Sequence, residues 1–491
     1  MSKVPRLRGS GTDGVRAVSF PPAARAAAER LSPAAGALLE RVEADPSLLR
    51  RDRFAPLLAA CRAVIPTLVG FDPAKPYGLQ PWPVLVAPAR RRELERAAVG
   101  LARIVRTLPK RAFGNDPAAV ARFYGLESEL LAALLLAEPT ALDSTICRGD
   151  FVDGPDGVVC LELNFGNVAS WQDNAVSTAY LASPPVAGWV AEAGLELAWE
   201  DTVGRLFRHA VRTCARRPDL ADGELNLAVV AATEGIYSLD NHPLPLYRER
   251  FAQALAEDAG GRPGSLHLVG ADALAFDRGR LVVGGHRIHG VVEELDRVTG
   301  RDLFRSQKAG RLELFTGPIG PLVLGDKRNL ALLSERCESD LFDAAERELI
   351  RRHVPWTRRV ERRPVLRGGA ERPLPDLLAA EREAFVLKQA IAVGGQGVVV
   401  GRSEEPAAWR AAVERALAEG SWIAQEYVDT PLYPFQAGEE GWAPHRLVWG
   451  PFVFGETYAG LFVRLLPTAA GPVVNLGRGA VVGLAFEVAG A

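Results

Sequence analysis

Two short segments that flank a tight turn carry polar side chains at every second position. Arg148 and Asp150 belong to the first segment, and Glu162 and Asn164 belong to the second, with the sequence DGPDG at positions 153–157 between them. Glycine, proline and aspartate at this density are typical of a β-hairpin turn. Because side chains alternate faces along a strand, each of these pairs shares one face of its strand. The sequence therefore predicts an antiparallel hairpin with a polar face.

A turn centred near position 155 brings Asp150 roughly opposite Glu162, with side chains about 5 Å apart. Cys160 and Asn164 are expected on the same face as Glu162. Two carboxylates and an amide oxygen that face one gap are hard ligands of the kind that bind Mg²⁺ together with water and phosphate. The alternative is the polar, solvent-facing side of an ordinary hairpin, and these residues alone do not decide between the two.

Length and composition limit the class of protein. A chain of 491 residues is expected to form two to four packed units. It is 48% hydrophobic and 24% charged, which is typical of a soluble globular protein. The formal net charge is −2, and no basic run with interleaved aromatic residues occurs, so we expect no nucleic-acid partner. No stretch reaches the roughly 18 apolar residues of a membrane span, and the first residues lack the apolar core of a signal peptide. We therefore expect a cytoplasmic protein without a membrane partner.

The most apolar stretch and the cysteines give two smaller expectations. Positions 130–136 are bounded by Glu129 and Glu138, and we predict a buried helix segment there. The five cysteines are widely spaced and form no C-x-x-C motif. This spacing argues against a disulfide framework and against structural zinc.

Lysine is rare in this chain. Only six of the 58 basic residues are lysines, and arginine is used almost everywhere else. Lys327 and Lys388 lie beside apolar residues that are typical of strands, and the other four lie in polar or proline-flanked segments. A lysine kept in such a context favours a role that needs a compact ammonium group.

A glycine-rich segment follows Lys388. A strand ends at this lysine, the glycines are Gly394, Gly395 and Gly397, and a second strand starts at Val398. A bend of this kind can bring backbone N–H groups close to phosphate oxygens. It is neither a Walker A loop nor a dinucleotide-binding fingerprint, and by itself it is equally compatible with a plain hairpin turn. A helix at 405–419 and an apolar strand at 421–428 come next.

The remaining periodicities predict a helical N-terminal region and a small α/β unit. Helices are predicted at 23–42, 53–68, 90–108, 117–136, 195–216, 248–258 and 342–354. Strands are predicted at 225–231, 265–269, 281–283 and 288–293, a connection at 355–375, and a final meander at 446–454, 457–465 and 473–487.

In this order the segments resemble the ATP-grasp family. K-x(5)-GGxG-V followed by QEYV is similar to the phosphate-covering loop and adenine-binding hinge of that fold, and GDKRNLALLSE is similar to the segment with its first phosphate lysine. R-x-D-F, then DG, then E-x-N resembles the metal-binding strands of glutathionylspermidine synthase and its relatives. The acidic segment precedes the lysines, as in circularly permuted ATP-grasp enzymes. The chain's last part, with Arg464 and Asn475, is similar to the R…N-x-x-x-G stretch that elsewhere precedes the metal carboxylates.

The resemblance covers about residues 145–170 and 317–480, and it implies a fold and a division of the chain. The expected fold is α/β (α+β), an ATP-grasp fold in circularly permuted order with a helical N-terminal region and an inserted small α/β unit. The expected parts are a helical region at 1–143, the metal-binding part at 144–205, a small α/β (pre-ATP-grasp-like) unit at 206–316, and the nucleotide-binding part at 317–491.

The resemblance also implies an activity and residue roles. The activity is an ATP- and Mg²⁺-dependent ligase that joins small-molecule or peptide carboxylates to amines through an acyl phosphate; the alternatives are a catalytically silent ATP-binding scaffold and an ATP-dependent phosphotransferase. The resemblance implies that Mg²⁺ is bound by Asp150, Glu162 and Asn164, and that Arg148 stabilises the charge of the transferred phosphoryl group or acyl phosphate. It implies that the nucleotide phosphates are contacted by Lys327 and Lys388 and covered by Gly394, Gly395, Gln396 and Gly397. It further implies that adenine and ribose are bound by Gln425, Glu426, Tyr427 and Val428.

One further segment and two single residues leave alternatives open. The run Trp171-Gln172-Asp173-Asn174 follows the predicted metal strands and either contacts substrate or caps a helix through Asp173 or Asn174. Arg464 and Asn475 are candidates for the same site, and the sequence does not decide their roles.

Overall fold

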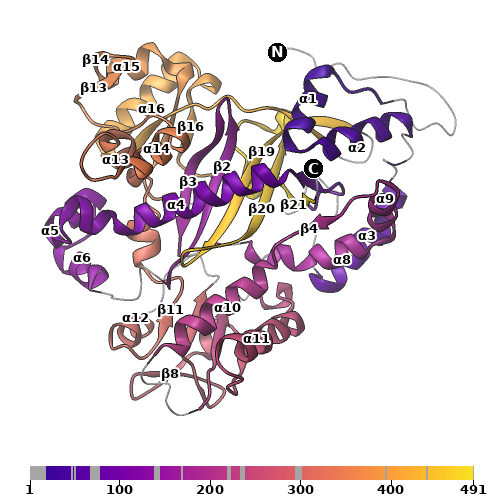
Figure 1. Ribbon diagram of the computed structural model, residues 1–491. Coiled ribbons are helices and arrows are strands. Elements are labelled where there is room, and N and C mark those ends of the chain that lie inside the picture. The colour runs from indigo at the N-terminus through magenta and orange to yellow at the C-terminus, as the bar shows by residue number, and fades with distance from the viewer. Residues whose placement is uncertain are drawn as a thin grey trace.

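The computed structural model describes residues 18–45, 48, 51–66, 78–137, 144–166, 168, 170–217, 223–232, 238–293, 301–392, 395–437 and 441–489. Its architecture is mixed α/β, with groups of helices, two four-stranded sheets and two sheets of two and three strands around one large sheet (Figure 1). The predicted α/β class is confirmed at this level.

The large sheet combines strands from distant parts of the chain. Its order is β1-β21-β20-β19-β2-β3, with β18 beside β19 and β4 beside β21. The pair β1–β21 is parallel and the other pairs are antiparallel. The strands are β1 (Val84–Val86), β2 (Ile146–Gly154), β3 (Gly157–Phe165), β4 (Leu197–Ala198), β18 (Tyr433–Gln436), β19 (Trp442–Phe454), β20 (Thr457–Pro467) and β21 (Val481–Val488). The predicted hairpin and the predicted final meander therefore form one sheet.

The hairpin β2–β3 has the predicted register. Asp150 pairs with Glu162 and Arg148 pairs with Asn164. Immediately after Asp150 the register shifts, so that Phe151 pairs with Cys160 and Leu161 is the extra residue of a β-bulge. The strict alternation assumed from the sequence therefore ends at this bulge.

Helix α4 (Pro88–Phe113) runs across one face of the large sheet (Figure 1). Its Arg90 forms an ion pair of 3.3 Å with Asp153, and the Asp153 carboxylate also accepts hydrogen bonds from Tyr433 and Trp449. Because Asp153 and Asp150 are separated by an odd number of positions on β2, they project from opposite faces. The face with Asp150 is therefore the face away from α4.

Two of the predicted N-terminal helices are each divided into two. The predicted helix at 23–42 separates at Ser32, whose Oγ accepts the Ala35 N–H as a cap while Pro33 cannot donate to the preceding turn. The predicted helix at 117–136 separates at Gly125, which has a left-handed backbone (φ 60°). The helices in this region are α1 (Pro22–Leu31), α2 (Pro33–Ala44), α3 (Arg51–Val64), α5 (Pro117–Tyr124) and α6 (Glu129–Leu136).

The prediction of a buried segment at 130–136 is wrong. Helix α6 forms, but within it only Ala132 and Leu135 are buried, and Leu130 is 70% exposed. A short helix at the edge of the molecule packs with one face only, and a run of leucine and alanine does not reveal which face that is.

Strands between residues 227 and 314 form a separate four-stranded sheet. This sheet has the order β11-β10-β5-β6, and all its pairs are parallel. The predicted helix at 195–216 begins only after Asp201, whose carboxylate accepts the Gly204 N–H, because Leu197–Ala198 pairs with β21 as β4. The elements of this region are α8 (Ser177–Ala182), α9 (Pro184–Glu192), α10 (Thr202–Ala215), β5 (Leu227–Val230), α11 (Leu244–Asp258), β6 (Leu266–Val269), β7 (Ala275–Asp277), β8 (Arg280–Val283), β9 (His286–Arg287), β10 (Gly290–Glu293), α12 (Arg301–Lys308) and β11 (Glu313–Leu314).

A second small sheet forms after residue 320, with the order β12-β17-β15-β16 and antiparallel pairs. The predicted connection at 355–375 contains structure that the sequence analysis missed. There, β13 and β14 form a hairpin whose turn uses Gly368 and Gly369, both with positive φ. The elements are α13 (Arg328–Arg336), α14 (Ala344–His353), β12 (Thr357–Arg359), β13 (Pro364–Arg367), β14 (Ala370–Pro373), α15 (Leu374–Ala380), β15 (Phe385–Gln389), β16 (Val398–Val400), α16 (Pro406–Glu419) and β17 (Trp422–Glu426).

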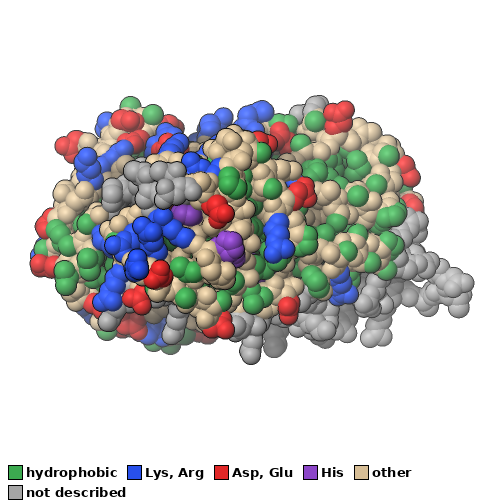
Figure 2. All heavy atoms as spheres, turned by 90° about the horizontal axis from the view of Figure 1, so that it is seen from below, with side chains coloured by type: hydrophobic (Ala, Val, Ile, Leu, Met, Phe, Trp, Pro, Cys, Tyr) green, Lys and Arg blue, Asp and Glu red, His purple; other side chains and the backbone are tan. Residues whose placement is uncertain are grey.

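The surface carries charges of both signs. On the underside of the molecule, Lys and Arg side chains gather in one group, with acidic and hydrophobic side chains beside it (Figure 2). In the part of the chain that the structure describes, no helix is long and apolar enough to cross a membrane.

Candidate active site

Lys327 connects the hairpin to the second half of the chain. It lies just before α13, and its Nζ is 3.3 Å from Glu162 Oε1. The same Nζ donates a hydrogen bond of 3.1 Å to the carbonyl of Ala392, and the Lys327 backbone N–H donates to the carbonyl of Ala390. The ammonium group therefore lies between the carboxylate of β3 and the segment that follows β15.

Lys388 makes a second connection, from β15 to the hairpin. Its Nζ donates to the carbonyl of Leu161 at 3.0 Å and to Gln425 Oε1 at 2.6 Å. Leu161 is the bulge residue, and a bulge leaves backbone groups outside the strand ladder. Burial lowers the pKa of Lys388 to about 8, although the carboxylate of Glu162 acts in the opposite direction. Lys388 is thus a buried cation held on the same hairpin as the two carboxylates.

Asp150 is held between two arginines. Its carboxylate lies 2.6 Å from Arg464 Nη2, on β20, and 3.3 Å from Arg148 Nε, on its own strand. Burial by itself would raise the pKa of Asp150, but the charges of Arg464 and Arg148 hold it below its usual value. The carboxylate is therefore ionised at neutral pH.

Arg148 and Arg464 share an aromatic support. Both guanidinium groups lie over the ring of Phe462, at 5.5 Å and 5.8 Å from its centroid. Asn164, on the neighbouring strand β3, also contacts β2, because its Nδ2 donates to the Arg148 carbonyl at 3.2 Å. The two arginines are thus positioned side by side at Asp150.

A cleft of about 950 Å³ lies between the hairpin, the second small sheet and the end of the chain. The predicted site residues that line it are Asp150, Glu162, Lys388, Gly395, Gln425, Glu426, Tyr427 and Val428. Among the described residues, the predicted site residues outside this lining are Arg148, Asn164, Lys327, Gln396 and Gly397. Of these, Arg148 and Lys327 contact the two lining carboxylates directly. Gly394 lies outside the described residues.

The glycine segment contacts the end of the chain. Gly395 and Gly397 have φ of 73° and 62°, a left-handed backbone that favours glycine. The Gly395 carbonyl accepts a hydrogen bond of 2.9 Å from Arg478 Nη2, and a Cβ on Gly395 would lie 3.3 Å from Val473. The segment around Val473 lines the cleft as well. The glycine segment and the C-terminal segment therefore border the same opening.

The strand β17 forms another wall of the cleft. Gln425 is buried, and its side chain has two partners. Its Oε1 accepts a hydrogen bond from Lys388, and its Nε2 donates to Thr357 Oγ1 at 3.3 Å. Glu426 forms an ion pair of 3.0 Å with Arg367, and the Tyr427 backbone N–H donates to the carbonyl of Ala384. These contacts hold the strand end firmly against β15.

Several lining residues were missed or left undecided by the sequence analysis. Arg464 and Asn475, whose roles were left open above, both border the cleft. Arg446 and Thr430, which were not singled out as site residues, border it as well. Arg446 and Arg464 lie on β19 and β20, and only the pairing of these strands with each other and with β2 brings them to Asp150. Spacing along the chain carries no signal of that pairing.

Cys160 does not line the cleft. The bulge at Leu161 shifts the alternation, so Leu161 faces the cleft, and Cys160 is fully buried opposite Phe151. The expectation that Cys160 shares the face of Glu162 is therefore wrong, for a reason that the sequence does not reveal.

The run Trp171–Asn174 lies in a 3-10 helix, Trp171–Val176, and does not line the cleft. Asn174 Nδ2 donates to Thr202 Oγ1 at 2.8 Å and to the carbonyl of Leu461 at 3.4 Å, so it connects two elements and caps neither. Burial raises the pKa of Asp173 to about 7, while a hydrogen bond from Ser170 and the charge of Arg148 act to lower it.

The donor set of the hairpin matches a hard cation. Within the described ranges, no group of three or more His, Cys, Asp or Glu side chains is arranged as a metal site. Asp150 and Glu162 face each other and are supplemented by an amide, Asn164, two residues further along β3. Carboxylate and amide oxygens suit Mg²⁺, which keeps water and phosphate as its other ligands.

The arrangement of sheets and helices is similar to that of a solved structure described as a glutathione synthetase-like effector. The chain is similar in structure to a glutathione synthetase-like effector from Globodera pallida in its apo form, with a TM-score of 0.51 and 12% identity over 89% of this chain and 98% of that one. A putative gamma-glutamylcysteine synthetase from Methylobacillus flagellatus aligns with a TM-score of 0.38 and 12% identity over 76% and 88% of the two chains, too distant for an argument. No family model and no curated protein matches the chain. At this identity the likeness concerns the fold.

Proposed function

We propose that this protein is an ATP-dependent ligase that joins a carboxylate to an amine through an acyl phosphate and requires Mg²⁺. We further propose a circularly permuted ATP-grasp fold, similar to that of glutathionylspermidine synthase, with the metal-binding part at 144–205 and the nucleotide-binding part at 317–491. The observation that carries the proposal is the cleft in which Asp150 and Glu162 lie with Lys388, and with Lys327 in contact with Glu162. The fold of a glutathione synthetase-like protein supports the ligase class.

The charges around the cleft complement a nucleotide triphosphate. The cations Lys327, Lys388, Arg148 and Arg464 exceed the carboxylates Asp150 and Glu162 by two positive charges when Lys388 is protonated. Mg-ATP carries about two negative charges, so it balances this excess. In the proposed mechanism Lys327 and Lys388 contact the phosphates, and the strand end from Gln425 to Val428 holds the adenine and ribose.

Asp150, Glu162 and Asn164 would hold Mg²⁺. The metal would supply positive charge that neutralises part of the charge on the phosphates. In the structure these carboxylates pair with Arg464 and Lys327, and in holding the metal they would release both cations. The released guanidinium and ammonium groups are then free to contact phosphate.

The chemistry needs two group transfers. In the first, an oxygen of the substrate carboxylate forms a bond to the γ-phosphorus, the bond from that phosphorus to the bridging oxygen breaks, and ADP leaves. In the second, the amine nitrogen forms a bond to the acyl carbon, the bond from that carbon to the phosphate oxygen breaks, and the nitrogen loses a proton as phosphate leaves. Arg148 and Arg464 are placed to stabilise the charge on the transferred phosphoryl group, since such transfers depend mainly on positioning and preorganised charge.

The proposal is tested by incubating the protein with Mg-ATP and a mixture of amino acids and polyamines. Release of ADP and phosphate that requires both an acid and an amine is the expected result. Tight ATP binding without turnover in any mixture would instead indicate a nucleotide-binding scaffold. A stable phosphorylated product without an amide would indicate a phosphotransferase.

A further inference from the structure

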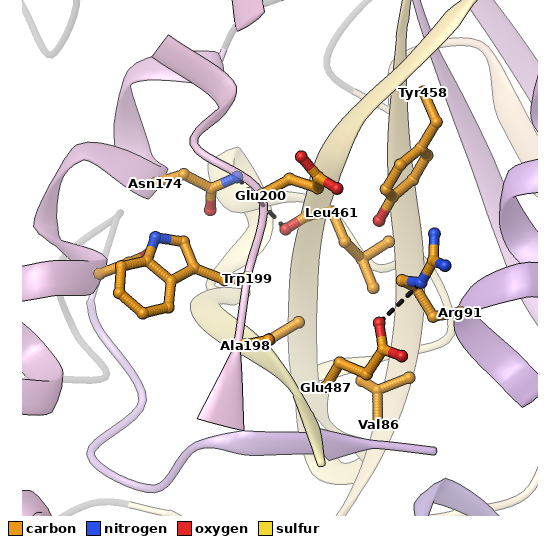
Figure 3. Close-up of a pocket in the computed structure, with 11 residues that line it drawn as sticks. Val86, Arg91, Asn174, Ala198, Trp199, Glu200, Tyr458, Leu461 and Glu487 are labelled. Carbon is orange, nitrogen blue, oxygen red and sulfur yellow. Dashed lines mark hydrogen bonds and ion pairs between the residues drawn. The ribbon is translucent and has the colours of Figure 1, made fainter. Parts of the chain in front are cut away.

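A second cavity lies on the opposite face of the large sheet from the proposed active site. Its volume is about 510 Å³, and it lies between α4, the segment that includes β4, and the strands β20 and β21 (Figure 3). Leu461 lines this cavity, whereas the adjacent Phe462 supports the two arginines at Asp150. Because neighbouring residues of a strand point to opposite faces, the sheet separates the two sites.

Two largely buried polar side chains of the cavity wall each leave one oxygen without a protein partner. Tyr458 is 6% exposed, and its hydroxyl points into the cavity and has no hydrogen bond to any described residue (Figure 3). Asn174 is 9% exposed and uses Nδ2 for Thr202 and Leu461, but its Oδ1 has no described partner. Both residues line the cavity, so each oxygen can form a hydrogen bond with a molecule bound there. Their position indicates a polar ligand.

The charges at the cavity favour a cation. Arg91 Nη1 donates to Glu95 at 2.6 Å, and Arg91 Nε forms an ion pair of 2.7 Å with Glu487, so the guanidinium is paired with carboxylates. Glu200 forms an ion pair of 2.8 Å with Arg205 through Oε2 only. The charged side chains that line the cavity are two carboxylates, Glu200 and Glu487, and one guanidinium group, Arg91. The wall therefore offers oxygen acceptors and one surplus negative charge.

The rest of the wall is apolar and aromatic. Trp199 is 38% exposed and lies against the opening, with Val86 and Leu461 on the far side (Figure 3). An indole ring attracts organic cations and also covers an apolar body. We propose that this cavity binds a small primary amine with an apolar or aromatic body, whose ammonium group contacts Glu200, Glu487 and Tyr458.

This inference does not depend on the proposed ligase activity. An amine that reacts in the main cleft must approach Asp150 and Glu162, and the sheet lies between those residues and this cavity. The second cavity is therefore a separate amine site.

The test titrates 2-phenylethylamine into the full chain by calorimetry, with 2-phenylethanol and 3-phenylpropionate as the neutral and anionic comparators. We expect saturable binding of the amine, binding of the alcohol that is weaker by about tenfold or more, and no binding of the acid. Glu200→Gln and Tyr458→Phe should each weaken amine binding by about fivefold or more. Glu95→Gln is the matched control, because Glu95 pairs with Arg91 but does not line the cavity, and it should change the affinity by less than about twofold.

Three results would overturn this assignment. They are no saturable binding of the amine at millimolar concentration, equal binding of the acid, or an affinity that Glu200→Gln leaves unchanged in a protein whose thermal unfolding matches wild type. Asp150→Asn separates the two sites: it should abolish ATP turnover and leave amine binding intact. Loss of amine binding in Asp150→Asn would assign the amine to the main cleft instead.

Discussion

The ammonium group of Lys327 lies 3.3 Å from the carboxylate of Glu162. One residue precedes α13 and the other lies on β3, so this ion pair joins two segments that are far apart in the sequence. Lys388 donates a hydrogen bond to the Leu161 carbonyl, and Arg464 forms an ion pair with Asp150. Together these three contacts bring lysines, arginines and carboxylates to one cleft.

Removal of the hairpin carboxylates should abolish catalysis without unfolding the protein. Asp150→Asn and Glu162→Gln keep the shape of each side chain and remove its charge, so the proposed Mg²⁺ loses a ligand. We expect Mg-dependent ADP release to fall by about 100-fold or more in each variant. Asp156→Asn changes an exposed aspartate in the turn of the same hairpin and should have wild-type activity. Full activity in both site variants would contradict the metal assignment.

Nucleotide binding should require the ammonium group of Lys388, which arginine should not replace. Lys388→Met removes the ammonium group, and ATP affinity measured by calorimetry should fall by about tenfold or more. Lys388→Arg should not restore it, because a planar guanidinium does not fit the space between the Leu161 carbonyl and Gln425 Oε1. Lys308→Met, at a half-buried lysine of α12 whose Nζ donates to the Leu134 carbonyl and which does not line the cleft, is the control. Unchanged ATP affinity in Lys388→Met would exclude a phosphate contact by this residue.

The parts of the site that depend on residues close together in the chain could be predicted from the sequence, and the parts that depend on distant residues could not. The pairing of Asp150 with Glu162 was predictable because a short turn sets the register of a hairpin. The bulge at Leu161, which gives Lys388 its carbonyl partner, has no sequence signal. Arg464 reaches Asp150 only through the order β20-β19-β2, which long-range packing decides. Leu130 shows the same limit for helices, since composition alone does not identify which side of a short helix is exposed.

Asp173 should make the stability of the protein depend on pH. Burial raises its pKa to about 7 in the folded protein, whereas an unfolded aspartate has a pKa of about 4. Between these values the folded state binds more protons than the unfolded state, so the free energy of unfolding falls as pH rises. Asp173→Asn removes this effect, so its free energy of unfolding relative to wild type should rise between about pH 5 and about pH 7.

Denaturant unfolding at several pH values measures this difference. Asp272→Asn, at an exposed position, provides the comparison and should follow wild type throughout. A constant difference between Asp173→Asn and wild type across the same range would show that Asp173 has an ordinary pKa.

Gly397 should affect ATP binding in the cleft as well as the stability of its own turn. A Cβ at Gly397, where φ is 62°, would lie 2.5 Å from Gln389 Oε1 and 2.9 Å from Gln389 Cβ, so Gly397→Ala pushes β15 away from the glycine segment. Gly420 has φ of 65° but no described atom within 4 Å of such a Cβ, and it ends α16. Both alanine variants should lose about 1 kcal/mol or more of stability through the left-handed backbone.

ATP affinity should separate these two variants. We expect it to fall by about tenfold in Gly397→Ala, because Lys388 is on the displaced strand, and to stay at the wild-type value in Gly420→Ala. Equal affinities in both variants would mean that the glycine segment does not position the phosphates.

The structure of the protein with Mg²⁺ and a non-hydrolysable ATP analogue tests the central claim most directly. We predict that the metal lies between Asp150 and Glu162, and that the phosphates contact Lys327 and Lys388 with the adenine beside Gln425–Val428. A nucleotide bound elsewhere, or phosphates that contact neither lysine, would contradict the proposed active site.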